Sequence, residues 1–202
     1  AGVARRLAGA AFGDDRVFLE ACVERPRHIE IQLLADRRGR AMHLYERDCS
    51  LQMRHRKLVE EAPAPGLARG PLEDLGARAE RAAMELGYDN VGTLETLRGG
   101  DGGFGFIEMN TRIQVEHGVT EAVTGLDLVA TQIALAAGAG LPERPALSGC
   151  AVEVRVYAED PAANFRPTPG PLHIYREPTG IGVRVDSGVE QGMDVPIQYD
   201  PM

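Results

Sequence analysis

The chain has 202 residues, of which 44% are apolar and 26% are charged, and its net charge is −8. This composition excludes wholesale disorder, and the length permits one large domain or about one and a half ordinary ones with a sizeable core. The acidic balance argues against nucleic acid or an anionic membrane as a partner of the whole surface.

Three cysteines, Cys22, Cys49 and Cys150, lie far apart and lack the spacing of a zinc site or a disulfide framework. We therefore expect a reducing, cytoplasmic environment. The longest apolar stretch, residues 128–137, is too short to cross a bilayer. The sequence has no initiating methionine, and we expect it to be part of a longer protein.

The first half of the chain predicts a β-hairpin followed by a loop. Residues 28–36 alternate apolar and polar side chains, and so do residues 41–48 after a turn at 36–40. This alternation indicates strands with one face on a core and the other toward solvent or a ligand. Residues 51–66 are polar and end in alternating proline and alanine, so we interpret them as a basic loop.

The middle of the chain predicts two helical regions around a second hairpin. Residues 71–86 have the periodicity of an amphipathic helix, with proline in the first turn and glycine after the last. Residues 91–97 and 104–110 read as paired strands, and residues 120–137 as a helical region broken near Gly125.

A shift toward Gly, Pro and Leu over residues 138–149 indicates a domain boundary. After it we expect a strand that begins at Val152 and further strands over residues 172–176 and 181–186. The region after the boundary is therefore expected to be mainly β.

The most specific signal is FIEMNTRIQVEH, residues 106–117. If this segment is extended throughout, one of its faces is wholly polar and carries both charge signs. Such a row of long hydrogen-bonding side chains is typical of a lined cleft rather than of a solvent-exposed strand face. The residues of the row are Glu108, Asn110, Arg112, Gln114 and Glu116.

The second hairpin adds a partner to this row, because a turn centred near Asp101 places Glu95 opposite Glu108. Two adjacent carboxylates repel each other unless a proton or a cation lies between them. Carboxylate and carboxamide oxygens suit Mg²⁺ or Mn²⁺, so the register predicts a divalent-metal nucleotide site. The alternative is a solvated face whose carboxylates pair with arginines, since a register slip of one residue would separate the two glutamates.

The basic run Arg54, His55, Arg56 and Lys57 has two interpretations. It is a solvated turn or, if it folds over the metal face, a source of positive charge for phosphates or bicarbonate. Arg155, taken alone, reads as a surface arginine.

Four segments, in unchanged order over nearly the whole chain, resemble the biotin carboxylase component of biotin-dependent carboxylases. That family includes acyl-CoA, pyruvate and urea carboxylases. RVYAEDP and the stretch over residues 184–202 look most like acyl-CoA carboxylase alpha subunits. The four segments are PRHIEIQLLAD (26–36), ERDCSLQMRHRKLVEEAPAP (46–65), FIEMNTRIQVEH (106–117) and VEVRVYAEDP (152–161).

The resemblance implies an α+β fold in which residues 1–142 are the C-terminal part of an ATP-grasp domain and residues 143–202 are part of a β-rich biotin carboxylase C-terminal domain. It implies that ATP and bicarbonate give carboxyphosphate and ADP, and that the carboxyl group then passes to N1′ of biotin on a carrier protein. The resemblance also implies Mg²⁺ or Mn²⁺ as a cofactor of this reaction. The implied partners are the biotin carboxyl carrier, a second copy in a homodimer and a carboxyltransferase subunit.

The resemblance also implies a role for each matching position. Three positions match the metal site, with Glu95 and Glu108 as ligands and Asn110 beside them. Two positions match residues that contact adenine, namely Glu20 and the Val23 backbone. Three positions match residues near the ribose and phosphates, namely His28, Gln52 and His55. The bicarbonate positions are Lys57, Arg112, Gln114 and the Val115 backbone, with Glu116 as the base that deprotonates bicarbonate and Arg155 as the residue that stabilises the biotin enolate.

Several features depart from the family pattern. Gly118 stands where the family usually has proline, which predicts a more mobile loop around Glu116. Met53 and Arg56 replace an arginine and a glutamine of the basic loop. The family's glycine-rich phosphate loop does not occur in this sequence, so we expect the chain alone to bind ATP weakly. Two alternatives stay open: another ATP-grasp ligase of the carbamoyl-phosphate synthetase type, and a non-catalytic nucleotide-binding or subunit-interaction module.

Overall fold

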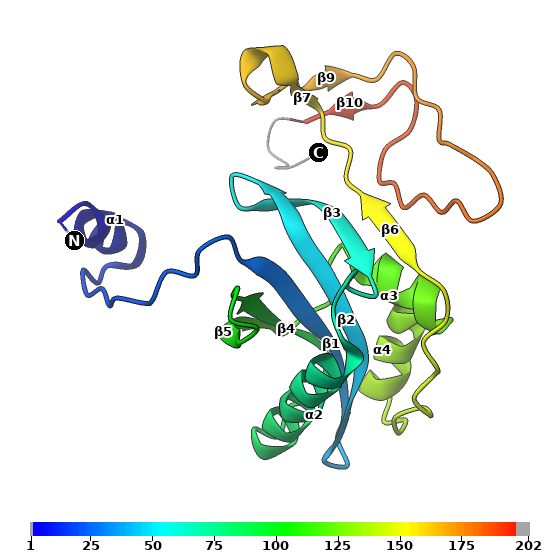
Figure 1. The fold of residues 1–202 in the computed structure, drawn as a ribbon. Helices are drawn as coiled ribbons and strands as arrows, with labels where there is room; N and C mark the ends of the chain where they lie inside the picture. The colour runs from blue at the N-terminus through cyan, green and yellow to red at the C-terminus, as the bar shows by residue number, and fades with distance from the viewer. Residues whose placement is uncertain (1, 197–202) are drawn as a thin grey trace. The chain divides into compact units, whose positions relative to one another are not determined.

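The computed structural model describes residues 2–196, and its internal contacts divide the chain into two units between Glu153 and Val154. The first unit contains helices and a six-stranded sheet in the order β5-β4-β1-β2-β3-β6 (Figure 1). Neighbouring strands from β5 to β3 are antiparallel. The strands are β1 (Arg27–Asp36), β2 (Arg40–Met53), β3 (Arg56–Ala62), β4 (Asn90–Arg98), β5 (Phe104–Asn110) and β6 (Ala151–Val154).

Both predicted hairpins are confirmed, as β1–β2 and β4–β5. The expected loop over residues 51–66 is wrong. β2 continues to Met53, and β3 pairs back onto it through a two-residue turn. Arg54 and His55 in this turn have φ values of 52° and 65°. Positive φ at both positions is the geometry that a tight type I′ hairpin requires. The prolines that disfavour a strand begin only at Pro63, after β3 has ended.

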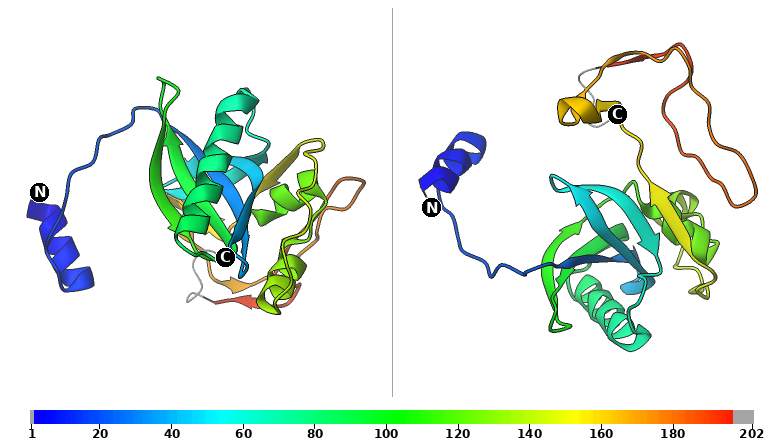
Figure 2. Two further views of the ribbon diagram at one scale, coloured as in Figure 1. Left: turned by 90° about the horizontal axis from the view of Figure 1, so that it is seen from below. Right: turned by 45° about the horizontal axis from the view of Figure 1, so that its top comes forward.

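Helices cover both faces of the sheet (Figures 1 and 2). α2 (Arg69–Glu85) packs Leu75 and Ala79 against Ile31 and Leu33 of β1. The opposite face is covered by α3 (His117–Thr124) and α4 (Leu128–Ala136), which come after β5 in the chain. Leu128 belongs to a separate apolar cluster on that face. α1 (Gly2–Phe12) has no buried residue.

The helix boundaries agree closely with the pattern in the sequence. The α2 prediction is confirmed, and Gly87, with φ 63°, follows its end. The predicted break near Gly125 is also confirmed, since this residue has φ 71° and separates α3 from α4. No single helix of the described residues is long and apolar enough to span a membrane, and α3 and α4 meet such a requirement only as a pair bent by 96°.

β1 has no solvent-exposed face. The even-numbered polar residues Glu30 and Gln32 are as deeply buried as the apolar residues between them. Protein side chains cover the polar face, so the expectation that this face is open to solvent is wrong. That face carries the candidate site.

The second unit, described as far as residue 196, contains short paired strands. β7 (Glu159–Asp160) pairs with β8 (Arg166–Pro167), and β9 (Gly170–Pro171) pairs with β10 (Asp194–Val195). The strands expected over residues 172–176 and 181–186 are not formed in this described part. Their apolar side chains, such as Ile174 and Ile181, are exposed and have no core to alternate against. The end of the 184–202 motif, residues 197–202, lies outside the described residues.

The contact between α2 and β2 yields a stability prediction. A Cβ at Gly76 would lie 2.5 Å from Nε2 of His43, which is buried. At Gly70, in the first turn of the same helix, an added Cβ has no heavy atom within 4 Å. The interior position Gly76 gains at least as much helix propensity from alanine as Gly70 in the first turn, so a larger loss of stability at Gly76 reports the overpacking.

We expect Gly76→Ala to be less stable than Gly70→Ala by about 1–3 kcal/mol in urea denaturation. Equal free energies of unfolding for the two variants would contradict the close packing of His43 on α2.

Candidate functional site

Four charged residues face one another across four adjacent strands. Arg47 of β2 lies opposite Glu30 of β1, Glu30 lies opposite Glu95 of β4, and Glu95 lies opposite Glu108 of β5. The predicted register of Glu95 and Glu108 is thus confirmed. Three carboxylates side by side repel one another strongly unless cations lie among them.

Lys57, from the start of β3, supplies one of these cations. Its Nζ lies 2.5 Å from Oε2 of Glu30, 2.9 Å from Oε1 of Glu95 and 2.6 Å from Oε1 of Glu116. Burial disfavours the ammonium form, but the carboxylates, first Glu30 and then Glu116, raise the pKa of Lys57 above its ordinary value. The β2–β3 hairpin, which forms where the sequence predicts a loop, therefore delivers a permanent positive charge into the site.

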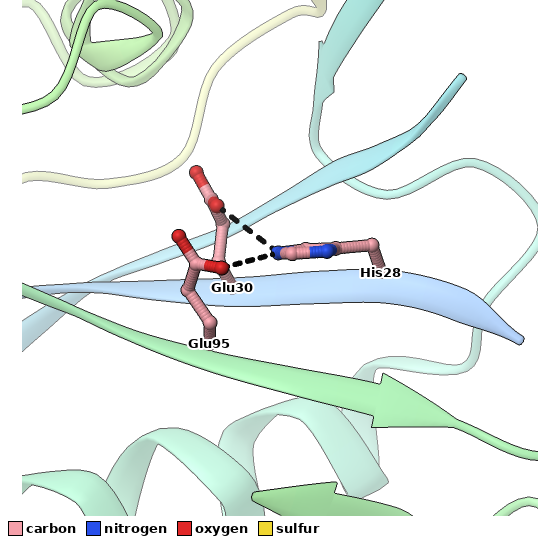
Figure 3. Close-up of side chains that lie close together, drawn as sticks. All are labelled: His28, Glu30 and Glu95. Atoms are coloured by element: carbon pink, nitrogen blue, oxygen red, sulfur yellow. Dashed lines mark ion pairs between the residues drawn. The ribbon is translucent and has the colours of Figure 1, made fainter. Parts of the chain in front are cut away.

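His28 lies at the end of the cluster on β1, with its ring toward two glutamates (Figure 3). Its Nε2 is 2.9 Å from Oε2 of Glu95 and 3.6 Å from Oε2 of Glu30. Burial opposes the imidazolium, yet the two carboxylates raise the pKa of His28 to about 9. Burial likewise opposes ionised Glu95, but His28 and Lys57 lower the pKa of Glu95 to about 2. Nε2 of Gln52 lies 3.1 Å from the second His28 nitrogen.

Asn110 connects the two predicted metal ligands. Its Nδ2 donates to Oε1 of Glu95 at 3.0 Å and to Oε1 of Glu108 at 3.2 Å. Glu108 is exposed, so this end of the carboxylate row is open to solvent. The paired carboxylates of Glu95 and Glu108 are the oxygen ligands that Mg²⁺ or Mn²⁺ prefers and fit such an ion, whereas Asn110, whose NH₂ group faces them, lies beside the pair as a hydrogen-bond donor.

The row predicted over residues 106–117 is only partly a strand. β5 ends at Asn110, and the chain then turns before α3 begins at His117. Gln114 and Glu116 are buried, and Nε2 of Gln114 donates to Oε1 of Glu95 at 2.8 Å. A straight strand would carry both side chains away from Glu95 and Lys57. The extended alternation beyond Asn110 is therefore wrong.

Other predicted residues lie outside this cluster. Glu20, which is exposed, and Val23, which is partly buried, precede β1, and His55 is exposed in the β2–β3 turn. Arg112 is exposed, and its Nη1 donates to the Ile113 carbonyl. The remaining two are Val115, which is exposed, and Arg155, which is partly buried and belongs to the second unit.

Sequence reasoning missed two members of the cluster, Glu30 and Arg47. Glu30 could have been found from the polar face of β1. Arg47 could not, because strict alternation along β2 places it on the face of His43 and Tyr45. Tyr45 has φ 66° and interrupts the β1–β2 register, so that Arg47 shares a face with Glu30.

Comparison with known proteins defines the family. The profile described as carbamoyl-phosphate synthase L chain, ATP binding domain, matches residues 1–144, and that of the biotin carboxylase C-terminal domain matches residues 153–202. The chain belongs to the biotin carboxylase family. The expected α+β fold, part of an ATP-grasp domain followed by part of a biotin carboxylase C-terminal domain, is confirmed.

Biotin carboxylase relatives resemble the chain along almost its entire length. It is 51% identical to the biotin carboxylase of Haemophilus influenzae over 96% of the chain and 44% of that protein. It is 48% identical to the alpha subunit of the mitochondrial methylcrotonoyl-CoA carboxylase of Rattus norvegicus over 98% of the chain and 28% of that protein. The chain thus spans less than half the length of these relatives.

A solved biotin carboxylase structure extends this similarity to three dimensions. The biotin carboxylase domain dimer of Hydrogenobacter thermophilus 2-oxoglutarate carboxylase matches with a TM-score of 0.93 and 44% identity, over 98% of this chain and 45% of that one. That structure is a complex with MgADP, ADP and bicarbonate.

The position of Lys57 among three carboxylates predicts a large stabilising contribution. Lys57→Met would leave those carboxylates without their shared cation, and we expect the free energy of unfolding to fall by about 3 kcal/mol. The exposed Arg78 of α2 provides the control, since Arg78→Met should change it by less than about 0.5 kcal/mol. Urea denaturation measures both, and equal effects would show that the Lys57 contacts contribute little.

Proposed function

We propose that the protein containing this chain carboxylates biotin on a carrier protein at the expense of ATP, with bicarbonate as the carboxyl source. The observation that carries the proposal is the placement of the Glu116 carboxylate against Lys57, next to the paired Glu95 and Glu108. A base, a cation for an anionic substrate and a metal-binding pair thus occupy one cluster. We further propose that residues 1–142 belong to the ATP-grasp domain and residues 143–202 to the C-terminal domain.

Glu95 and Glu108, with Asn110 beside them, would hold the divalent cation. When bound, this cation would neutralise the negative charge that develops on the phosphates as the phosphoryl group moves. The row of carboxylates supports this assignment, because four acidic groups in the cluster face only two permanent cations and one histidine. His28 and Gln52, which lie together, would contact the ribose and phosphates, with His55, and Glu20 and Val23 would contact adenine.

Glu116 would take the proton of bicarbonate. In the structure its carboxylate is buried, and its Oε1 accepts a hydrogen bond from Lys57 at 2.6 Å. A bicarbonate anion that accepts a hydrogen bond from Lys57 would draw the ammonium away from Glu116 and let that oxygen accept the proton instead. Arg112, Gln114 and the Val115 backbone would hold the remaining oxygens of the anion.

The deprotonated bicarbonate would attack the γ-phosphorus of ATP to give carboxyphosphate and ADP. The carboxyl group would then pass to N1′ of biotin as phosphate leaves, and the departing phosphate would take the N1′ proton. Arg155, in the second unit, would stabilise the biotin enolate. The proposed partners are a biotin carboxyl carrier, a second copy of the chain and a carboxyltransferase subunit. A neighbour described as a dimer supports the second copy, and a relative named as one subunit of a carboxylase supports the other partners.

The first functional prediction concerns Glu116. In the full-length protein, Glu116→Gln should lower bicarbonate-dependent ATP hydrolysis by about 10²- to 10⁴-fold, because the amide cannot accept the proton. Glu85→Gln, at the exposed end of α2, is the matched control and should leave the rate unchanged. A rate of ATP turnover that does not depend on bicarbonate would contradict the proposal. Faster turnover with ammonia than with biotin as acceptor would favour a carbamoyl-phosphate synthetase type of ligase.

The second functional prediction concerns the proposed metal-binding pair, Glu95 and Glu108. Glu108→Gln in the full-length protein should weaken Mn²⁺ binding by at least about 10-fold, since even outer-shell partners of a bound metal contribute that much. Electron paramagnetic resonance of free Mn²⁺ measures the affinity without turnover. Glu85→Gln again serves as control. Unchanged Mn²⁺ affinity in Glu108→Gln would place the ion elsewhere.

A further inference from the structure

Arg47 is the largest fully buried side chain of the described residues, with a relative exposure of 0%. Removing a guanidinium from water is costly unless an anion and further hydrogen bonds compensate it. A buried arginine of this kind therefore marks a place where the surroundings are built around its five donors.

All five N–H groups of Arg47 have an acceptor, and the acceptors come from four parts of the chain. Nε donates to Oε1 of Glu30 at 2.6 Å. Nη1 donates to Oε1 of Gln32 at 2.6 Å and to Oγ1 of Thr120 at 3.0 Å. The remaining two bonds run from Nη2 to Oγ1 of Thr93 at 3.3 Å and to Oε1 of Gln114 at 3.2 Å.

The bond to Gln114 determines which way that amide points. A guanidinium has no acceptor, so the group that faces it must be the carbonyl oxygen of Gln114. The NH₂ group is then directed to the other side, where it donates to Oε1 of Glu95 at 2.8 Å. Arg47 thus selects the one orientation of the Gln114 amide in which its NH₂ group faces the carboxylate cluster.

The bonds from Arg47 to Glu30 and Thr120 also fix groups that surround the site. Oε1 of Glu30 is taken by Arg47, which leaves Oε2 for Lys57 at 2.5 Å. Thr120 belongs to α3, which begins directly after Glu116, so its bond ties the first turns of that helix to the sheet. Arg47 therefore fixes the surroundings of Lys57 on two sides.

We propose that Arg47 is a positioning residue of the bicarbonate site, which acts by fixing the amide orientation of Gln114 and the carboxylate of Glu30. The inference rests on the proposed function, because Gln114 and Lys57 are assigned to the anion there. Arg47 itself is fully buried and its five donors are taken up by protein groups, so it acts through those groups.

The test uses the full-length protein and its bicarbonate-dependent ATP hydrolysis. Arg47→Met should raise the KM for bicarbonate by about 10-fold or more, with a smaller change in the KM for ATP. Thr93→Val removes another bond of Arg47 without touching Gln114 or Glu30, so it should leave both KM values unchanged. If Arg47→Met does not fold, Arg47→Lys, which keeps the charge but loses the planar fork, should raise the bicarbonate KM in the same way.

A double-mutant cycle identifies the route. If Arg47 acts through Gln114, the effects of Arg47→Met and Gln114→Met on the bicarbonate KM should not multiply in the double variant. Fully multiplicative effects, or an equal rise in both KM values, would reduce Arg47 to a stabilising residue and overturn the proposal.

A readout independent of turnover separates this inference from the proposed function. In protein labelled with ¹⁵N-glutamine, Arg47→Met should shift the side-chain amide resonances of Gln114, while Thr93→Val should not. Shifted resonances in a protein without bicarbonate-dependent activity would refute the function but keep the positioning role of Arg47. Unshifted resonances in an active protein would refute the positioning role alone.

Discussion

The structure depends on how three carboxylates can lie side by side across antiparallel strands. Glu30, Glu95 and Glu108 occupy directly opposed positions, where like charges are destabilising. Arg47 compensates one end of the row and Lys57 the middle, whereas the Glu108 end is open to solvent. The compensating charge is therefore unevenly distributed, and the Glu108 end, which has the least of it, is where we propose that a cation binds.

Local signals were sufficient for most of the fold. The second hairpin folds about a glycine-rich turn, so its register could be counted approximately from the sequence, and a one-residue shift between Glu95 and Thr96 sets the exact pairing of Glu95 with Glu108. The α2 helix followed from its periodicity and from Gly87. Where a prediction from the sequence was wrong, one local change in backbone conformation had interrupted the alternation of side chains. The positive φ of Tyr45 altered the face of β2, and a turn after Asn110 ended β5.

The candidate site shows the same division. The metal pair could be predicted because hairpin register is local, whereas the partners of Lys57 come from β1, β4 and the start of α3. No pattern in one sequence encodes such a meeting of distant segments. The polar row and the basic run marked Lys57, Gln114 and Glu116 as candidates, and the resemblance to biotin carboxylases assigned their roles, since it compares positions rather than contacts. Arg47 could not be found from the sequence, because the irregularity at Tyr45 decides which face of β2 it occupies.

β1 has one further consequence. From His28 to Leu33 its odd-numbered residues pack against α2 and its even-numbered residues belong to the polar cluster, so successive positions serve folding and chemistry in turn. An inserted residue within the strand would exchange the two sets, sending glutamate toward the helix and isoleucine toward the metal pair. An insertion before Arg27, by contrast, would leave the alternation along β1 unchanged.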